Sequence, residues 1–151
     1  MRVWRLARRV YPVLNGEGAR RAGSRWNSPG TAMVYTAGSR ALAALELLAY
    51  VNPGTEPADL ELFDIDVPDD AQVRNVTVGD LASDWRRPRH PACQLRGDAW
   101  VRSRESLLLA VPSVMIPEET NYLINPGHPD ARRIQLVGSR PFAYDPRLNS
   151  E

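Results

Sequence analysis

Residues 31–51 read TAMVYTAGSRALAALELLAYV, and this stretch decides how the chain begins to fold. Its first six residues include β-branched and aromatic side chains, which suit a strand. Ser39 is a good helix N-cap, and the alanine- and leucine-rich run after it has strong helix propensity. An Asn-Pro-Gly sequence at residues 52–54 then stops the helix. The stretch predicts a strand over residues 31–36 and a helix over residues 40–51.

Glu46 is the unusual residue of that helix. Leu42, Leu45, Glu46 and Ala49 have the spacing i, i+3, i+4 and i+7, which is the pattern of one buried face. One interpretation is that Leu45 and Leu48 define the apolar stripe and leave Glu46 solvated at its edge. The other is a carboxylate held in a pocket wall, where it suits general-base work or stabilises positive charge.

The rest of the chain predicts more strands than helices, without regular alternation between them. A turn-rich stretch covers residues 15–30, and turns with a short helix are expected over residues 117–129. The class is therefore α+β, with a mixed sheet, flanking helices and one domain over residues 1–151. The further strands are expected at residues 3–6, 59–67, 72–78, 107–111, 133–137 and 142–144, and a second helix at residues 92–103.

Composition narrows the class of protein. All nineteen basic residues are arginine, but eighteen acidic residues balance them, so the bulk basic field of a non-specific nucleic-acid binder is absent. Cys93 is the single cysteine, which excludes an internal disulfide and leaves no zinc ligand set. The sequence shows neither a signal peptide nor an apolar run long enough to span a membrane. We expect a cytoplasmic protein without metal.

Residues 23–27, GSRWN, form a polar and aromatic cluster that begins with glycine. Arg25 could clamp a diphosphate or carboxylate while Trp26 supplies a stacking wall. Alternatively, Trp26 anchors the loop in the core and Arg25 pairs with a neighbour. Tyr35 would be carried near the start of the Glu46 helix, as a site residue or as plain core.

Ser113 follows an uninterrupted apolar run that breaks at Pro112, so a hydroxyl is delivered at the end of a buried strand. No Gly-x-Ser-x-Gly elbow surrounds it, which disfavours a hydrolase nucleophile. We interpret Ser113 as a hydrogen-bonding group. His128, between glycine and proline, is expected to be structural.

Taken together, these residues resemble the RES domain, the toxin component of bacterial toxin–antitoxin pairs, named for its Arg, Glu and Ser. The family commonly has two glycines before the arginine, where this chain has Gly23 and Ser24. Residues 67–100 carry little that matches. The matching blocks follow the family order, at residues 23–27 (GSRWN), 34–37 (VYTA), 41–46 (ALAALE), 111–114 (VPSV), 121–129 (NYLINPGHP) and 145–148 (DPRL).

The resemblance implies a fold related to ADP-ribosyltransferases, with NAD as a substrate and no cofactor. The nicotinamide glycosidic bond would be broken by hydrolysis or phosphorolysis, or ADP-ribose would be transferred to a protein. Arg25 and Glu46 are then the implied catalytic residues. The implied NAD-binding residues are Arg25, Trp26, Asn27, Tyr35, Ser113 and Asn125.

The resemblance also implies a partner, an antitoxin with an Xre-like helix-turn-helix domain, in a hetero-oligomeric complex. We expect this partner to cover the region between Arg25 and Glu46, and we expect no direct contact with nucleic acid or membrane. A toxin or binding module directed at nucleic acid is the alternative, favoured only by the arginine-only basic set and the Trp85-Arg86-Arg87 sequence.

Overall fold

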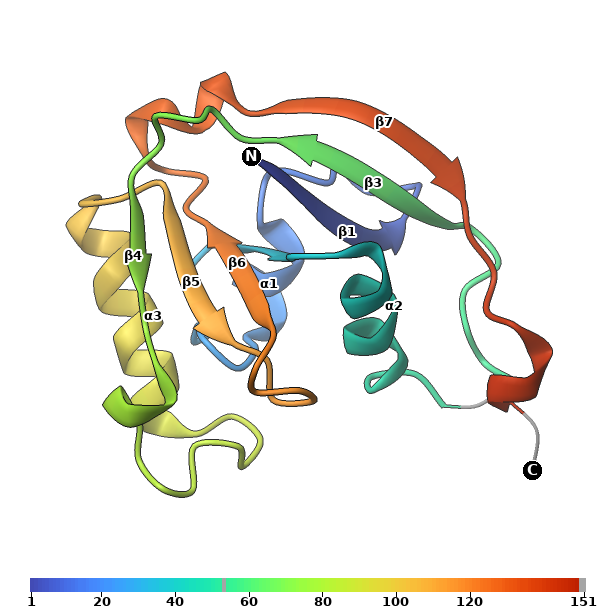
Figure 1. Cartoon of the computed structure of the whole chain (residues 1–151), viewed down its shortest axis with the longest axis horizontal. Coiled ribbons are helices and arrows are strands. Elements are labelled where there is room, and N and C mark those ends of the chain that lie inside the picture. Colours follow the sequence, from blue (N-terminus) through green and yellow to red (C-terminus); the bar gives the residue numbers. More distant parts are fainter. Residues whose placement is uncertain (53, 150–151) are drawn as a thin grey trace.

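Seven strands form one mixed sheet in the computed structural model, which describes residues 1–52 and 54–149 (Figure 1). Their order is β4-β5-β6-β2-β1-β3-β7, with β4 and β5 parallel and the other neighbours antiparallel. The mixed sheet expected from the sequence is confirmed. The strands are β1 (Arg2–Arg8), β2 (Val34–Ala37), β3 (Leu60–Asp66), β4 (Val73–Asn75), β5 (Leu108–Pro112), β6 (Thr120–Ile124) and β7 (Gln135–Pro141).

Helices are few and short, which confirms the α+β class. Within the described residues, no helix is both long and apolar enough to cross a membrane. The α-helices are α1 (Glu17–Ala22), α2 (Arg40–Leu48) and α3 (Pro91–Ser103), and the 3-10 turns are η1 (Val78–Asp80), η2 (Pro129–Arg133) and η3 (Pro146–Asn149).

The strand and helix predicted over residues 31–51 are present as β2 and α2. Ser39 caps α2, because its Oγ accepts a hydrogen bond from the Leu42 backbone N–H at 3.1 Å. The helix ends at Leu48 and not at residue 51, and Pro53 lies outside the described residues. The predicted buried face is wrong at its far end, since Ala49 is exposed.

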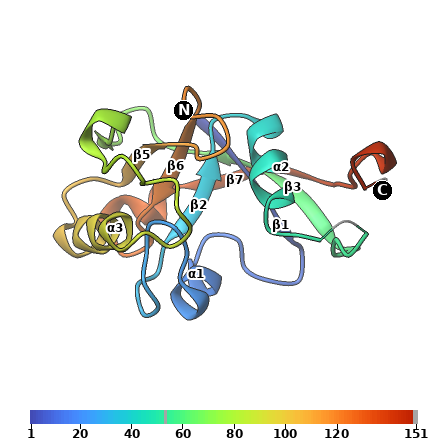
Figure 2. The same cartoon turned by 90° about the horizontal axis from the view of Figure 1, so that it is seen from below.

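Helices α2 and α3 pack on the same face of the sheet at opposite ends. Ala37 of β2 pairs with Asn121 of β6, which pairs with Val111 of β5, and residues paired in this way point to one face. Val111 belongs to the core cluster under α3, and Ala37 to the cluster under α2. Figures 1 and 2 show α3 beside β4 and β5 and α2 near β1. The polar ends of β5 and β6 therefore lie between two helix-covered regions.

Two sequence predictions for the backbone are wrong. Residues 117–129 were expected to be turn and short helix, but they contain β6, which pairs with β2 on one side and β5 on the other. Pairing with two neighbours favours a strand that five residues alone specify weakly. The turn-rich stretch after β1 also contains the short helix α1.

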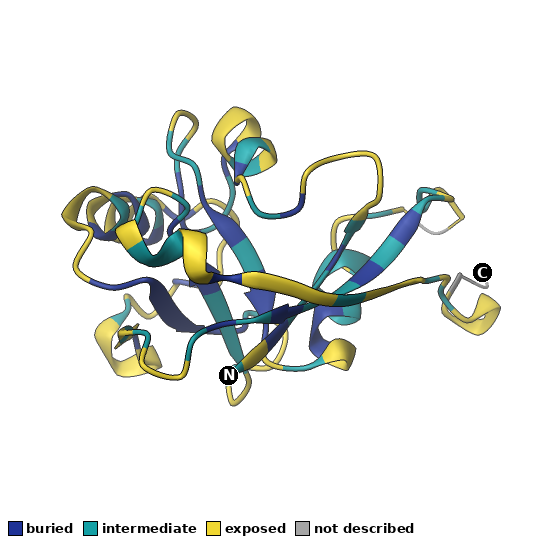
Figure 3. Ribbon diagram, turned by 90° about the horizontal axis from the view of Figure 1, so that it is seen from above, coloured by how far each residue is buried: buried dark blue, intermediate teal, exposed yellow. Residues whose placement is uncertain are grey.

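The last strand also differs from expectation. Residues 133–137 and 142–144 were predicted as two strands, and the structure has the single strand β7 with a bulge opposite Asp64 and Ile65. Beyond its end, the Phe142 N–H still donates to the Leu60 carbonyl at 3.0 Å. Most of β7 is exposed, and it is the long yellow strand across the centre of Figure 3. It is an edge strand whose sequence carries little alternation.

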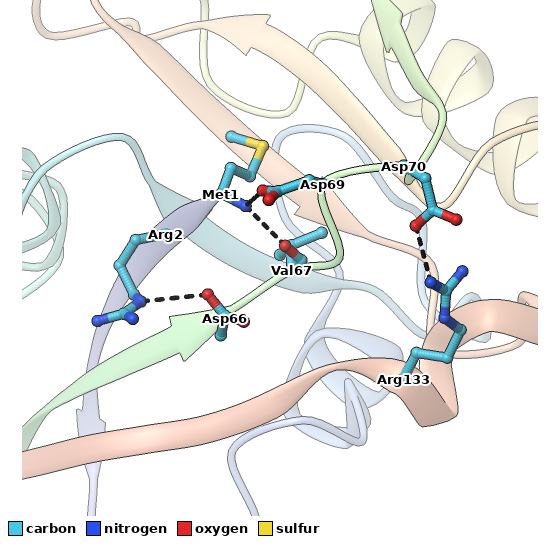
Figure 4. Close-up of polar contacts among 7 residues, drawn as sticks. All are labelled: Met1, Arg2, Asp66, Val67, Asp69, Asp70 and Arg133. Atoms are coloured by element: carbon cyan, nitrogen blue, oxygen red, sulfur yellow. Dashed lines mark hydrogen bonds and ion pairs between the residues drawn. The ribbon is translucent and has the colours of Figure 1, made fainter.

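Polar contacts fix the start of the chain (Figure 4). The Met1 amino group donates to the Val67 carbonyl at 2.6 Å and to Asp69 Oδ1 at 2.7 Å. Arg2 lies 3.5 Å from Asp66 on the paired strand β3. These contacts hold β1 in register between β2 and β3.

Candidate functional site

Glu46, Ser113 and Asn121 form one hydrogen-bonded cluster. The Ser113 hydroxyl donates to Glu46 Oε1 at 2.6 Å, and the Asn121 amide donates to the same oxygen at 2.8 Å. Hydrogen bonds to a charged acceptor contribute about 1.5–3 kcal/mol each. The half-buried Glu46 is therefore a held carboxylate and not a freely solvated one at the helix edge.

Three different elements deliver these side chains. Glu46 lies in the second turn of α2, Ser113 directly follows β5, and Asn121 is the second residue of β6. Ser113 is fully buried, and its Oγ also accepts from the backbone N–H groups of Met115 and Ile116 at 3.1 and 3.2 Å. The turn after β5 therefore fixes the direction in which Ser113 donates to Glu46.

Asn121 lies in β6, a strand that the sequence did not predict. Its Oδ1 is buried and has no hydrogen-bond partner among the described residues. Leaving such an acceptor unsatisfied costs about 1–3 kcal/mol. On Glu46, Oε2 likewise accepts no hydrogen bond from the described residues, although Oε1 accepts two. Two acceptors of the cluster are thus without a partner among the described residues, Asn121 Oδ1 and Glu46 Oε2. The one sequence signal for Asn121 was its place at the start of the block 121–129.

Arg25 is held quite differently, by main-chain oxygens. Its Nη1 donates to the carbonyls of Trp85 and Arg87 at 2.9 and 3.1 Å, and its Nη2 donates to the Arg86 carbonyl at 3.3 Å. The expected acidic neighbour is absent from these contacts. Its partners instead lie within the unmatched residues 67–100, in the Trp85-Arg86-Arg87 sequence that had been related only to nucleic acid.

Tyr35 connects the loop of residues 23–27, which carries Arg25 and is called the arginine loop below, to the sheet. Its hydroxyl donates to Asn27 Oδ1 at 2.6 Å and accepts from the Trp26 backbone N–H at 3.0 Å. Burial raises the pKa of the Tyr35 phenol above its usual range. On β2, Tyr35 lies two residues before Ala37, the partner of Asn121, so the two side chains share a face at about 7 Å spacing. Arg25, Tyr35 and the Glu46 cluster therefore line one face of the sheet, although no contact in the described part of the chain joins Arg25 to Glu46.

Three of the expected NAD-binding residues are buried in structural contacts. Trp26 packs in the core with an exposed fraction of 2%, as the anchoring interpretation expects. The Asn27 amide donates to the carbonyls of Ala19, Ser28 and Thr31. Asn125 donates to Val101 O and accepts from the Gly127 N–H. Their direct contact with substrate stays a prediction, and their burial favours a supporting role.

Helix α3 packs against the arginine loop and forms hydrogen bonds with it. Gly97 approaches so closely that a Cβ there would lie 1.6 Å from the Trp26 carbonyl oxygen. Asp98 accepts from the Ser28 N–H at 3.0 Å, and Gln94 donates to Ser24 O at 2.9 Å. The loop is therefore fixed by a helix that the sequence predicted but did not connect with it.

Two cavities lie apart from the Glu46 cluster. A cavity of about 50 Å³ is lined by residues such as Trp85, His90 and Cys93, and burial raises the pKa of the Cys93 thiol. A second cavity of about 290 Å³ lies over β3 and β7, and neither is lined by Glu46. No group of three metal-ligating side chains occurs in residues 1–52 and 54–149. Trp85 is buried, so the Trp85-Arg86-Arg87 sequence offers no stacking surface for nucleic acid.

Comparison with known proteins gives one family. The sequence model described as "RES domain" matches residues 2–145. The chain is 44% identical to the "Prs ADP-ribosylating toxin" of Sphingobium sp. strain YBL2, over 96% of this chain and 94% of that protein. It is 36% identical to "Toxin Res" of Yersinia enterocolitica, over 98% and 99% of the two chains.

A solved structure shares the fold. A chain in the crystal structure of the M. tuberculosis MbcT-MbcA toxin–antitoxin complex superposes with a TM-score of 0.77. The match covers 98% of this chain and 86% of the other at 23% identity, so it speaks for the architecture alone.

Proposed function

The chain belongs to the RES domain family, and from that premise we propose that it is the toxin of a toxin–antitoxin pair that cleaves the nicotinamide glycosidic bond of NAD. The observation that carries the proposal is the Glu46 carboxylate, in which Ser113 and Asn121 fix Oε1 while Oε2 accepts from none of the described residues. A carboxylate held in this way suits a reaction that develops positive charge on a ribose.

The chemistry gives a role to Glu46 Oε2, which accepts no hydrogen bond from the described residues. When the bond between C1′ and the nicotinamide nitrogen breaks, its electron pair leaves with nicotinamide, which becomes neutral, and C1′ gains positive charge. Glu46 Oε2 would accept from a hydroxyl of the nicotinamide ribose and stabilise that charge. Asn121 would keep Oε1 occupied through its amide, which leaves Oε2 for the ligand.

The other residues have supporting roles in this proposal. Arg25 would hold the diphosphate, because a guanidinium offers paired N–H donors to phosphate oxygens. The ring of Tyr35 would lie beside the nicotinamide end of NAD, while its hydroxyl keeps the Trp26–Asn27 turn in place. Ser113 is fully buried, so it would orient Glu46 from the protein interior.

Three acceptors of ADP-ribose remain under the proposal, namely water, phosphate and a protein side chain. Attack by water or phosphate gives hydrolysis or phosphorolysis, with the proton of the attacking hydroxyl released. Attack by a protein side chain gives ADP-ribosylation, which is favoured by the name of the 44% identical relative, the Prs ADP-ribosylating toxin. All three reactions release nicotinamide, so one measurement tests the shared step.

An antitoxin partner follows from the same proposal. A toxin must be silenced in the cell that makes it, and the MbcT-MbcA structure is that of a toxin–antitoxin complex. We propose that a protein with an Xre-like helix-turn-helix domain, encoded beside this chain, covers the face between Arg25 and Glu46. Co-expression of the neighbouring gene should abolish both the growth arrest and the NAD reaction, and arrest that persists would contradict it.

The direct test incubates the purified protein with NAD and follows nicotinamide release, with and without phosphate and protein acceptors. Glu46→Gln should lower the rate about 10²–10³-fold, as for loss of one transition-state interaction. Glu105→Gln, which removes an exposed carboxylate paired with Arg74, is the matched control and should keep the rate. No release by the wild type, or equal release by Glu46→Gln, would overturn the proposal.

A further inference from the structure

Residues 84–90 wrap around Arg25 with three consecutive carbonyl groups. The carbonyls of Trp85, Arg86 and Arg87 accept from its Nη1 and Nη2, so three of the five guanidinium N–H groups are used. The other two, on Nε and Nη2, have no partner among the described residues. Because three N–H groups of Arg25 are bound to carbonyls, only the N–H groups on Nε and Nη2 remain to donate to a ligand.

The segment is itself fixed from several sides. Trp85 is buried in the core cluster under α3. His90 accepts from the Ala92 N–H through Nδ1, so its Nε2 donates to Asp84 Oδ1 at 2.8 Å and closes the segment end to end. Arg89 donates to the Ala22 carbonyl at 3.0 Å. The segment is thus an anchored frame and not a free surface loop.

Arg86 joins this frame to the other half of the site. Its Nη2 donates at 2.7 Å to the carbonyl of Val114, the residue after Ser113, while its own carbonyl accepts from Arg25. One residue therefore contacts the arginine and the turn that positions the serine.

We propose that residues 84–90 are the positioning frame of Arg25 and that Arg86 is a positioning residue for the NAD reaction. The role of Arg86 rests on the proposed function. Arg86 fixes the distance between the Arg25 guanidinium and the Ser113 turn, so that diphosphate and ribose are held in register. Pre-organisation of this kind lowers the entropic cost of binding, because a long arginine side chain that is already fixed loses little rotamer freedom when the ligand binds.

Substitution of Arg86 tests the frame by kinetics. Arg86→Gln should raise KM for NAD about tenfold and change kcat by less than about threefold, since Ser113 keeps its own hydrogen bonds to Glu46 and to the N–H groups of the turn that follows it. Arg86→Lys, which keeps the charge and a donor, should recover part of the loss. Arg102→Gln on α3 removes an exposed charge elsewhere and should leave both constants unchanged. A fall in kcat alone, or an equal effect of Arg102→Gln, would overturn the proposal.

A double substitution shows whether Arg86 acts through Arg25. Arg25→Lys with Arg86→Gln should be no slower than Arg25→Lys alone, because the frame has then lost what it positions. Additive losses would refute the assignment.

A measurement without substrate separates this proposal from the proposed function. In wild-type protein, NMR should show slow rotation of the Arg25 guanidinium, and Arg86→Gln should speed that rotation while Arg102→Gln leaves it slow. Unchanged slow rotation in Arg86→Gln would overturn the frame even if NAD is cleaved. Faster rotation with no NAD cleavage by wild type would support the frame and overturn the reaction instead.

Discussion

Glu46 and Arg25 lie on the same face of the sheet but are held in opposite ways. Glu46 accepts from two side chains, Ser113 and Asn121, which lie 67 and 75 positions away in the chain. Arg25 donates to three main-chain carbonyls of residues 85–87. In this protein the carboxylate is therefore held by side-chain donors and the guanidinium by carbonyl oxygens, which every residue carries.

The Glu46 half and the Arg25 half of the site should therefore respond differently to substitution. The supports of Glu46 can be removed one at a time by substitution, because each is a side chain. The supports of Arg25 remain after any substitution that keeps the backbone in place. Damage to the Arg25 half must therefore come from moving the backbone.

The largest effect is expected from Gly97→Ala, which moves the backbone under Arg25. The new Cβ would lie 1.6 Å from the Trp26 carbonyl oxygen, so α3 and the 23–27 loop must separate. We expect the free energy of unfolding to fall by about 3 kcal/mol, measured by urea denaturation. Gly18→Ala on α1, where nothing lies within 4 Å, is the control and should be neutral or stabilising. Equal stability of the two variants would contradict the close packing.

Ser113→Ala tests the half that depends on side chains. It removes one donor from Glu46 and leaves the Met115 and Ile116 N–H groups without an acceptor. We expect a loss of about 1–3 kcal/mol in unfolding free energy and a fall of about tenfold to a hundredfold in nicotinamide release. Ser139→Ala on the exposed strand β7 should change neither. Full activity of Ser113→Ala would show that Asn121 alone suffices to hold Glu46.

Tyr35→Phe tests the link between the two halves. The variant leaves Asn27 Oδ1 and the Trp26 N–H unpaired, at an expected cost of about 1–2 kcal/mol in unfolding free energy. Tyr11→Phe changes an exposed phenol and serves as the control. If thermal melting finds both variants as stable as the wild type, the Tyr35 hydroxyl does not support the turn.

The smallest effect is expected at Tyr144, which contacts α2 through a main-chain carbonyl. Its hydroxyl donates to the Ala44 carbonyl at 2.6 Å, and burial raises its pKa to about 12. The folded pKa lies above the unfolded value of about 10, so this contribution is complete below pH 10 and is lost as the pH rises toward 12. Tyr144→Phe should cost about 1 kcal/mol at pH 8, measured by urea denaturation. The difference from wild type should shrink above pH 10, and a constant difference would refute the assignment.

Much of the fold could be predicted because its signals are local. The Ser39 cap and the run after it specify α2, and the apolar residues 107–111 specify a buried strand. Strand β6 could not be predicted in this way, because pairing on both sides makes its five residues extended. The single strand β7 is likewise determined by its pairing with β3.

By itself, the sequence predicted the class and the two longer helices and singled out Arg25, Tyr35, Glu46 and Ser113 as candidate site residues, since motif spacing and helix periodicity are properties of the chain. Only the tertiary structure decided what these residues touch. It brought Asn121 to Glu46 as a second donor, and Asn121 Oδ1 has no hydrogen-bond partner among the described residues. It also set residues 84–90 around Arg25, a contact with no sequence signal because the groups that make it are backbone carbonyls common to every residue.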